Sequence, residues 1–209
     1  MKSILLFCLI NIVSFTSFSQ ESKKPSSNIN AIAIGSLLPS PDNELLDVSG
    51  NKTSFKANEK LNGLLVIFSC NTCPYVVKNE TRMLNVIDMC GKMNIGVIVL
   101  NSNEAYRENE DSYAAMQTYA KEKGLNCSYV VDNNSEMADA FGAKRTPETF
   151  LFDKTRRLVY HGAIDDNPSD ESNVKRQHLL EALKETSEGK QVSLAESKSV
   201  GCGIKRKAN

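Results

Sequence analysis

The stretch LLVIFSCNTCPYV, residues 64–76, decides the fold, because it joins an apolar run to two cysteines and a proline. The run at 64–69 has the length and composition of a strand that is buried on both faces. Apolar residues then recur at helical spacing over 75–93, and Gly91 is the expected end of that helix. The two cysteines are therefore expected where a buried strand meets the N-terminus of a helix.

This position of Cys70 and Cys73 indicates redox chemistry. Unpaired backbone N–H groups and the helix dipole at a helix N-terminus favour a thiolate over a thiol. We expect Cys70 to be the more exposed, attacking thiol and Cys73, one helical turn away, to be the more covered, resolving thiol. A structural disulfide needs no such position. A zinc site needs further ligands nearby, whereas His161 and His178 lie far away in the sequence.

The rest of the chain predicts an α/β fold. Turn residues at 49–51 between short apolar pairs indicate an N-terminal β-hairpin. Further buried strands are expected at 95–101, 128–132, 149–153 and 158–164, and helices at 108–123, 135–141 and 174–188. Ser135 is the expected N-cap of one helix and Gly142 its stop. Strands that alternate with helices, followed by two strands joined by a short turn, predict a central mixed β-sheet flanked by helices.

A second element that bears on the cysteine pair is Thr146-Pro147, directly before the predicted strand at 149–153. Proline is tolerated at the start of a strand, so an ordinary strand entry is one interpretation. The other is a cis peptide bond that places the backbone of Thr146 beside the cysteines, where it would hydrogen-bond an extended substrate chain.

The N-terminus predicts export. Residues 1–19 join Lys2 to a short apolar stretch and end in small residues, which is typical of a signal peptide cut before Gln20. The stretch is short for a transmembrane span and is interrupted by polar residues. The polar residues 20–31 predict a flexible linker. We expect a periplasmic or extracellular protein without membrane insertion after cleavage.

The composition bears on two points: whether nucleic acid is a partner, and whether all the cysteines can form disulfides. Lys plus Arg and Asp plus Glu number 25 each, so nucleic acid is not an expected partner. Disulfides persist outside the cytosol, and the odd number of cysteines after residue 19 leaves at least one thiol unpaired. Cys90 and Cys127 fall in predicted core positions and are expected to act as small hydrophobic residues.

Several motifs in the same order resemble the thioredoxin-fold redoxins, and more closely a peroxiredoxin-like subgroup with a CNxCPYV segment. They are CNTCPYV at 70–76, VLNSN at 99–103, AFGAKRTPETFLFD at 140–153, YHGAIDDNP at 160–168 and GCGIK at 201–205. The resemblance implies a thioredoxin-like redoxin domain over 32–192. It also implies that Cys70 and Cys73 form the redox pair and that Pro147 is the cis-proline.

The sequence departs from related families at two positions. Thioredoxins have a buried acid six residues before the first cysteine, where this chain has Leu64. Peroxiredoxins have a threonine three residues before a Cys-Pro step, and that position is Cys70 if Cys73-Pro74 is the step. The departure at Leu64 argues against an efficient general thioredoxin and in favour of a specialised thiol-disulfide oxidoreductase, with the surface around Asn71, Thr72 and Thr146 selecting the substrate.

Two further residues have alternative interpretations. Arg145 either stabilises a thiolate and contributes to substrate binding or is solvated. Cys202 lies between glycines in a predicted C-terminal tail, 193–209. It is either a third redox thiol that exchanges with the pair or part of a tail that is anchored by an unrelated contact.

The sequence therefore predicts an exported enzyme that exchanges disulfides with thiol proteins or small thiols. It needs no metal and no cofactor other than the redox-active disulfide Cys70–Cys73. One alternative is a thiol peroxidase in which Cys73 reacts with peroxide and Cys70 resolves the sulfenic acid. Another is a non-catalytic module that holds Cu(I) between the two cysteines.

Overall fold

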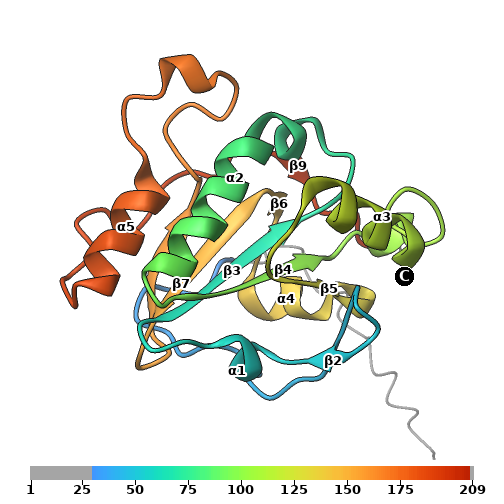
Figure 1. Ribbon diagram of the computed structural model, residues 1–209, viewed down its shortest axis with the longest axis horizontal. Helices are drawn as coiled ribbons and strands as arrows, with labels where there is room; N and C mark the ends of the chain where they lie inside the picture. The colour runs from blue at the N-terminus through green and yellow to red at the C-terminus, as the bar shows by residue number, and fades with distance from the viewer. Residues whose placement is uncertain (1–29, 208–209) are drawn as a thin grey trace, which may run out of the picture.

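The computed structural model describes residues 30–207, so the predicted signal peptide, 1–19, and linker residues 20–29 lie outside the described part (Figure 1). Over these residues the chain forms a seven-stranded mixed sheet. In spatial order its strands are β2 (Lys52–Thr53), β1 (Leu45–Asp47), β5 (Ser128–Val131), β4 (Gly96–Asn101), β3 (Gly63–Ser69), β7 (Glu148–Asp153) and β8 (Leu158–Gly162). β3, β4 and β5 run parallel, whereas β7 and β8 are antiparallel to their neighbours. The predicted central mixed sheet is confirmed.

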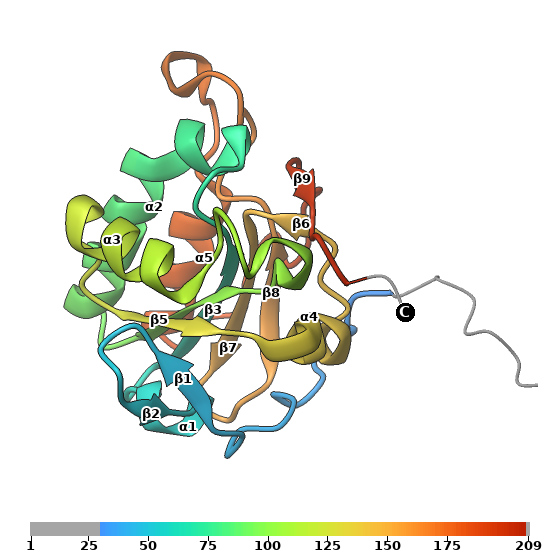
Figure 2. The ribbon, with the colours of Figure 1, turned by 90° about the vertical axis from the view of Figure 1, so that its right-hand side faces the viewer.

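Helices cover both faces of this sheet. The described helices are α1 (Phe55–Asn58), α2 (Pro74–Lys92), α3 (Tyr113–Lys123), α4 (Glu136–Phe141) and α5 (His178–Ser187), with 3-10 turns at Glu104–Tyr106, Asn133–Ser135 and Glu171–Asn173. α2, α3 and α5 pack on one face, and α1 and α4 pack on the other (Figure 2). None of the helices within residues 30–207 is long and apolar enough to cross a membrane.

β3 is apolar along its length because helices cover both faces of the sheet. Leu65 and Ile67 pack under α2 and α5, whereas Leu64, Val66 and Phe68 pack toward α4, so every residue of β3 is buried. On the α4 side, four phenylalanine rings surround the Phe141 ring at centroid distances of 5.3 to 5.8 Å. β3 is thus packed tightly on both sides, and the cysteine pair follows directly after its last residue.

The predicted hairpin is present, and β1 also pairs with β5 at the sheet edge. The helix expected at 108–123 begins only at Tyr113, because the Ser112 hydroxyl caps it by accepting from the Ala115 N–H at 3.3 Å. The helix expected at 174–188 likewise begins late, at His178.

Ser135 is the N-cap residue of α4, as predicted, but its side chain makes no capping hydrogen bond. Ser135 has a left-handed backbone, and its hydroxyl donates to the Ser102 carbonyl. The carboxylate of Asp132 accepts instead from the N–H groups of Met137 and Ala138 at 2.8 and 2.9 Å. Gly142 ends α4 in the left-handed conformation, as predicted.

The described C-terminal residues are packed against the domain. The Ser197 N–H donates to the His161 carbonyl of β8 at 3.0 Å. Farther on, β9 (Cys202–Gly203) pairs antiparallel with β6 (Arg145–Thr146) to form a second, two-stranded sheet. Figure 2 shows β9 and β6 side by side at the edge of the domain. The C-terminus thereby reaches the loop that precedes Pro147.

Candidate active site

Two loops form the site, and the first is the turn from β3 into α2. β3 ends at Ser69, and Cys73 is the N-cap residue of α2. Pro74 occupies the first helical position, where its missing N–H costs no hydrogen bond and its fixed φ suits a helix. Cys73 therefore lies at the positive end of a helix of 19 residues.

The second loop contains Thr146 and Pro147, whose peptide bond is cis. The Cys70 sulfur lies 3.5 Å from the Thr146 hydroxyl oxygen, and the Cys73 sulfur lies 3.3 Å from the Thr146 carbonyl oxygen. Glu148 holds this loop in place, because its carboxylate accepts from the N–H groups of Lys144 and Arg145 at 2.7 and 2.9 Å. The structure thus brings Cys70, Cys73 and Thr146 together.

The solvent exposure of the two thiols is the reverse of the prediction. Cys70 is 1% exposed and Cys73 is 5% exposed, so the expectation that Cys70 is the more exposed thiol is wrong. Both are free thiols in this structure. The pair lies beneath the loops rather than on the surface, because Cys70 follows directly on a strand that is buried on both faces.

The electrostatics of the pair also favour Cys73 as the thiolate. The pKa of the Cys73 thiol lies well below its ordinary value, because Cys70 donates a hydrogen bond to it, with further donation from Cys202 and from the Val76 N–H. The pKa of the Cys70 thiol lies well above its ordinary value, chiefly because of that shared proton and of burial. The charge of Asp111 raises it further.

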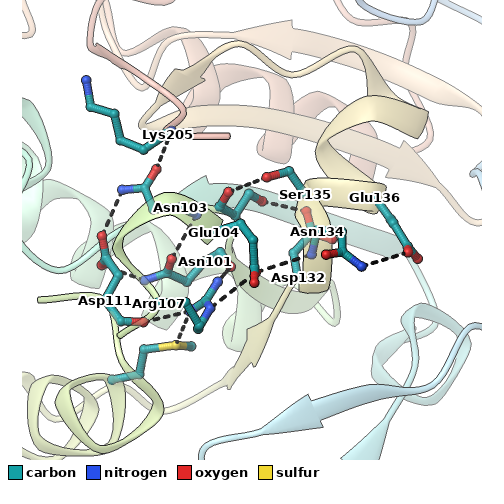
Figure 3. A network of polar contacts seen from close by, with 12 residues as sticks. Asn101, Asn103, Glu104, Arg107, Asp111, Asp132, Asn134, Ser135, Glu136 and Lys205 are labelled. Atoms are coloured by element: carbon teal, nitrogen blue, oxygen red, sulfur yellow. Dashed lines mark hydrogen bonds and ion pairs between the residues drawn. The ribbon is translucent and has the colours of Figure 1, made fainter. Parts of the chain in front are cut away.

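Asp111 is a site residue that the sequence analysis missed (Figure 3). This fully buried carboxylate accepts from the Asn71 backbone N–H at 2.9 Å, from the Asn101 amide at 2.7 Å and from the Asn103 amide at 2.8 Å. It therefore fixes the backbone between the two cysteines. Asp111 lies in a turn before α3 without a recognisable motif, so no sequence signal pointed to it.

Two of the predicted substrate-binding residues have different surroundings. The Asn71 side chain is buried, accepting from the Tyr129 hydroxyl at 2.8 Å and donating to the Glu110 carbonyl at 2.8 Å. The expectation that Asn71 faces the substrate is therefore wrong, because these partners lie inside the domain. Thr72 is exposed.

The other two predicted substrate-binding residues contact the C-terminus. Thr146 pairs with Cys202 across β6 and β9, and the Arg145 guanidinium donates to the Gly201 carbonyl at 2.9 Å. The backbone of Thr146 is therefore not open to an extended substrate in this structure, contrary to the prediction. Cys202 packs against the cluster that contains Cys70 and Cys73.

The remaining cysteines are far less suited to reaction. Burial raises the pKa of the Cys90 and Cys127 thiols to about 12. Cys90 lies on the buried face of α2 and is fully buried, and Cys127 packs against the same core cluster. Within residues 30–207 no group of three or more His, Cys, Asp or Glu residues is arranged to hold a metal ion.

Comparison with known proteins identifies the family. A scan against protein families matches Redoxin over residues 33–177. Among solved structures, a hypothetical protein from Sinorhizobium meliloti 1021 is 32% identical, with a TM-score of 0.78, over 86% of this chain and 98% of that chain. An uncharacterized conserved protein from Geobacillus kaustophilus is 28% identical, with a TM-score of 0.79, over 86% of this chain and 95% of that chain. No curated protein matches.

A more distant likeness concerns the fold alone. Peroxiredoxin Q from Xanthomonas campestris is 16% identical, with a TM-score of 0.53, over 74% of this chain and 98% of that chain. The fold is thioredoxin-like, as the sequence motifs implied. Because the family match spans most of the described residues, the chain belongs to the Redoxin family.

Proposed function

We propose that this protein is a thiol-disulfide oxidoreductase in which Cys73 is the nucleophile and Cys70 resolves the mixed disulfide. The observation that carries the proposal is the position of Cys73 at the N-terminus of α2, with Cys70 packed against it. A thiolate is the reactive form of cysteine, and these contacts favour it at neutral pH. The roles of the two cysteines are the reverse of those expected from the sequence.

The exchange proceeds in two steps. The Cys73 thiolate attacks one sulfur of a substrate disulfide, forms a mixed disulfide and releases the other sulfur as a thiolate. Cys70 loses its proton and attacks the Cys73 sulfur, which forms Cys70–Cys73 and releases the second substrate thiolate. Two electrons pass to the substrate, and the reaction runs backward when the partner is a dithiol.

The proposed partners are protein or small-molecule thiols and disulfides, and the proposed place of action is outside the cytosol. An oxidising compartment is where a disulfide of this kind persists. The signal-like residues 1–19 support export. The direction of electron flow then depends on the reduction potential of the pair relative to its partner.

Peroxide reduction is a second candidate because Cys73 combines a lowered pKa with the Cys-Pro step at the start of a helix. The Cys73 thiolate would attack a peroxide oxygen, release water or an alcohol and become a sulfenic acid. Cys70 would then attack the Cys73 sulfur and release water, leaving the disulfide. Against this candidate, Arg145 donates to the Gly201 carbonyl rather than to the thiolate.

The pH dependence of alkylation tests the assignment of the nucleophile. Between about pH 8 and pH 6 an ordinary thiol with a pKa of ~8.5 loses roughly 75-fold in its reaction rate with iodoacetamide, because its thiolate fraction falls. Cys73, whose pKa is lowered, is expected to lose less than about threefold over the same range. The rates are followed by mass spectrometry of the peptide that contains both cysteines.

Cys127 provides an internal comparison in the same samples, since its raised pKa predicts slow alkylation throughout this range. If Cys70 is alkylated before Cys73, the proposed roles are reversed. Rapid consumption of hydrogen peroxide with sulfenic acid at Cys73 would favour the peroxidase. Copper retained through purification in one equivalent would favour the Cu(I)-binding alternative.

A further inference from the structure

The C-terminal residues 201–206, here called the strap, occupy the place that an extended substrate would take beside the cis-proline loop. Antiparallel pairing places Cys202 opposite Thr146. The Ile204 N–H donates to the Lys144 carbonyl at 2.9 Å. These are the main-chain contacts by which an added strand binds an exposed edge. The strap therefore satisfies the edge that the sequence analysis assigned to substrate.

Other contacts anchor the strap on both sides of Cys202. Arg145 holds the Gly201 carbonyl, and the Lys205 N–H donates to the Asn103 side chain at 2.9 Å (Figure 3). Arg206 pairs with Asp139 at 2.7 Å. Because Asn103 also donates to Asp111, a single hydrogen-bonded network connects the strap to the loop between Cys70 and Cys73.

Gly201 permits the close approach of the strap to the cis peptide. A Cβ atom at this position would lie 2.2 Å from the Thr146 carbonyl oxygen and 2.8 Å from the Thr146 carbonyl carbon. Both atoms belong to the backbone of a packed loop, so they have little room to move. A Cβ atom at Gly203 would meet only the Lys144 carbonyl oxygen, at 4.0 Å. The spacing of the strap from the site thus depends on Gly201.

The strap brings a third thiol to the redox pair. Cys202 is half-buried and packs against the cluster of Cys70, Cys73 and Val76. Tyr75, in the first turn of α2, packs against the same cluster. Cys202 therefore lies beside the same helix N-terminus as Cys73.

We propose that Cys202 is a resolving thiol that exchanges with Cys73 within the chain, with the strap holding it where the cysteine of an extended substrate would lie. The inference rests on the proposed function, because it needs a mixed disulfide at Cys73. It also lets the substrate thiolate leave before Cys70 reacts, because Cys202 is half-buried whereas Cys70 is 1% exposed.

The exchange is balanced in sulfur and in electrons. Cys73 attacks a substrate disulfide, RS–SR′, forms a mixed disulfide with RS and releases R′S⁻. Cys202 gives up its proton and attacks the Cys73 sulfur, which forms Cys73–Cys202 and releases RS⁻. Cys70 then gives up its proton and attacks the same sulfur, which forms Cys70–Cys73 and returns Cys202 as a thiolate that is reprotonated. Two thiols are oxidised and one substrate disulfide is reduced.

A chain with Cys70→Ser tests the proposal, with oxidised glutathione as the substrate disulfide. A thiol held in the same chain has an effective concentration on the order of 1 mM or more. With about 0.1 mM reduced glutathione present, Cys73–Cys202 should therefore exceed the Cys73 glutathione adduct by roughly tenfold. Trypsin separates the two cysteines into different peptides, 61–78 and 199–205, so a disulfide between them is identified by mass. In the double variant Cys70→Ser with Cys202→Ser, the adduct should accumulate.

Three outcomes are distinct. A Cys73–Cys202 peptide pair in the Cys70→Ser chain supports the proposal. An adduct at Cys73 with Cys202 left as a free thiol overturns the role of Cys202 but leaves the proposed nucleophile in place. No adduct and no disulfide at Cys73 in either variant contradicts both the role of Cys202 and the proposed function.

The strap itself is tested by two matched glycine substitutions in the Cys70→Ser background. Gly201→Ala should displace the strap and shift the product severalfold from Cys73–Cys202 toward the adduct. Gly203→Ala, two residues away in open space, should leave the product ratio unchanged. Equal product ratios in the two variants would show that the strap does not position Cys202.

Discussion

Replacing Cys73 with serine is expected to lower the rate of disulfide reduction by roughly a thousandfold or more, to the uncatalysed level. The hydroxyl of serine stays protonated at neutral pH, so neither the helix N-terminus nor the hydrogen bond from Cys70 can make it a nucleophile. The rate is measured with a small aromatic disulfide whose released thiolate absorbs light. The reduced protein is mixed with the disulfide at an excess of protein, so that the measured rate is that of a single turnover.

Cys70→Ser is the matched control, because it changes the neighbouring sulfur and leaves Cys73 at the start of α2. This variant should still release one thiolate from the aromatic disulfide, since Cys73 performs the first attack. A Cys70→Ser chain that is as inactive as Cys73→Ser would mean that Cys70 attacks first, as the sequence analysis expected. The comparison therefore separates the two assignments of roles.

The second large effect is expected at Asp111. Asp111→Ala leaves one backbone N–H and two buried amides without their acceptor, which should lower the free energy of unfolding by about 3 to 5 kcal/mol. Unfolding in urea, followed by circular dichroism, gives this difference. Because Asp111 also raises the pKa of the Cys70 thiol, the surviving folded fraction should alkylate Cys70 at lower pH than the native chain does.

Glu110→Ala is the control for this measurement, since Glu110 is the adjacent acid and is exposed. Only its backbone carbonyl contacts Asn71, and the substitution leaves that carbonyl in place. We expect a change within about 0.5 kcal/mol. Equal destabilisation by the two substitutions would show that the buried carboxylate is not what holds the loop.

Local patterns in the sequence were sufficient to predict the buried strand and the ends of two helices. Residues 64–68 carry apolar side chains on both faces of an extended chain, which suits a strand covered on both sides. Pro74 marks the start of α2, because proline fits the first helical position and interrupts a helix elsewhere. Gly142 ends α4 for the corresponding reason, since it takes up the left-handed backbone at no steric cost. Each of these signals acts over a few residues.

The parts that were missed or wrong depend on contacts between distant segments. Asn71 is an ordinary polar loop residue until Tyr129, 58 positions away, meets its side chain. The greater burial of Cys70 depends on packing around the end of β3, and no spacing rule reports it. The position of the strap also depends on contacts between distant segments. The glycines around Cys202 carry no strand signal, whereas the folded chain uses Gly201 for a close backbone contact with Thr146.

The most direct test of the central claim is a redox titration of residues 20–209 in glutathione buffers, with mass mapping of every cysteine at each potential. We predict a reversible two-electron transition in which Cys73 takes part in every disulfide and Cys70–Cys73 forms and is reduced again, while Cys90 and Cys127 stay thiols. Persistence of Cys70 and Cys73 as free thiols across the whole range would contradict the claim.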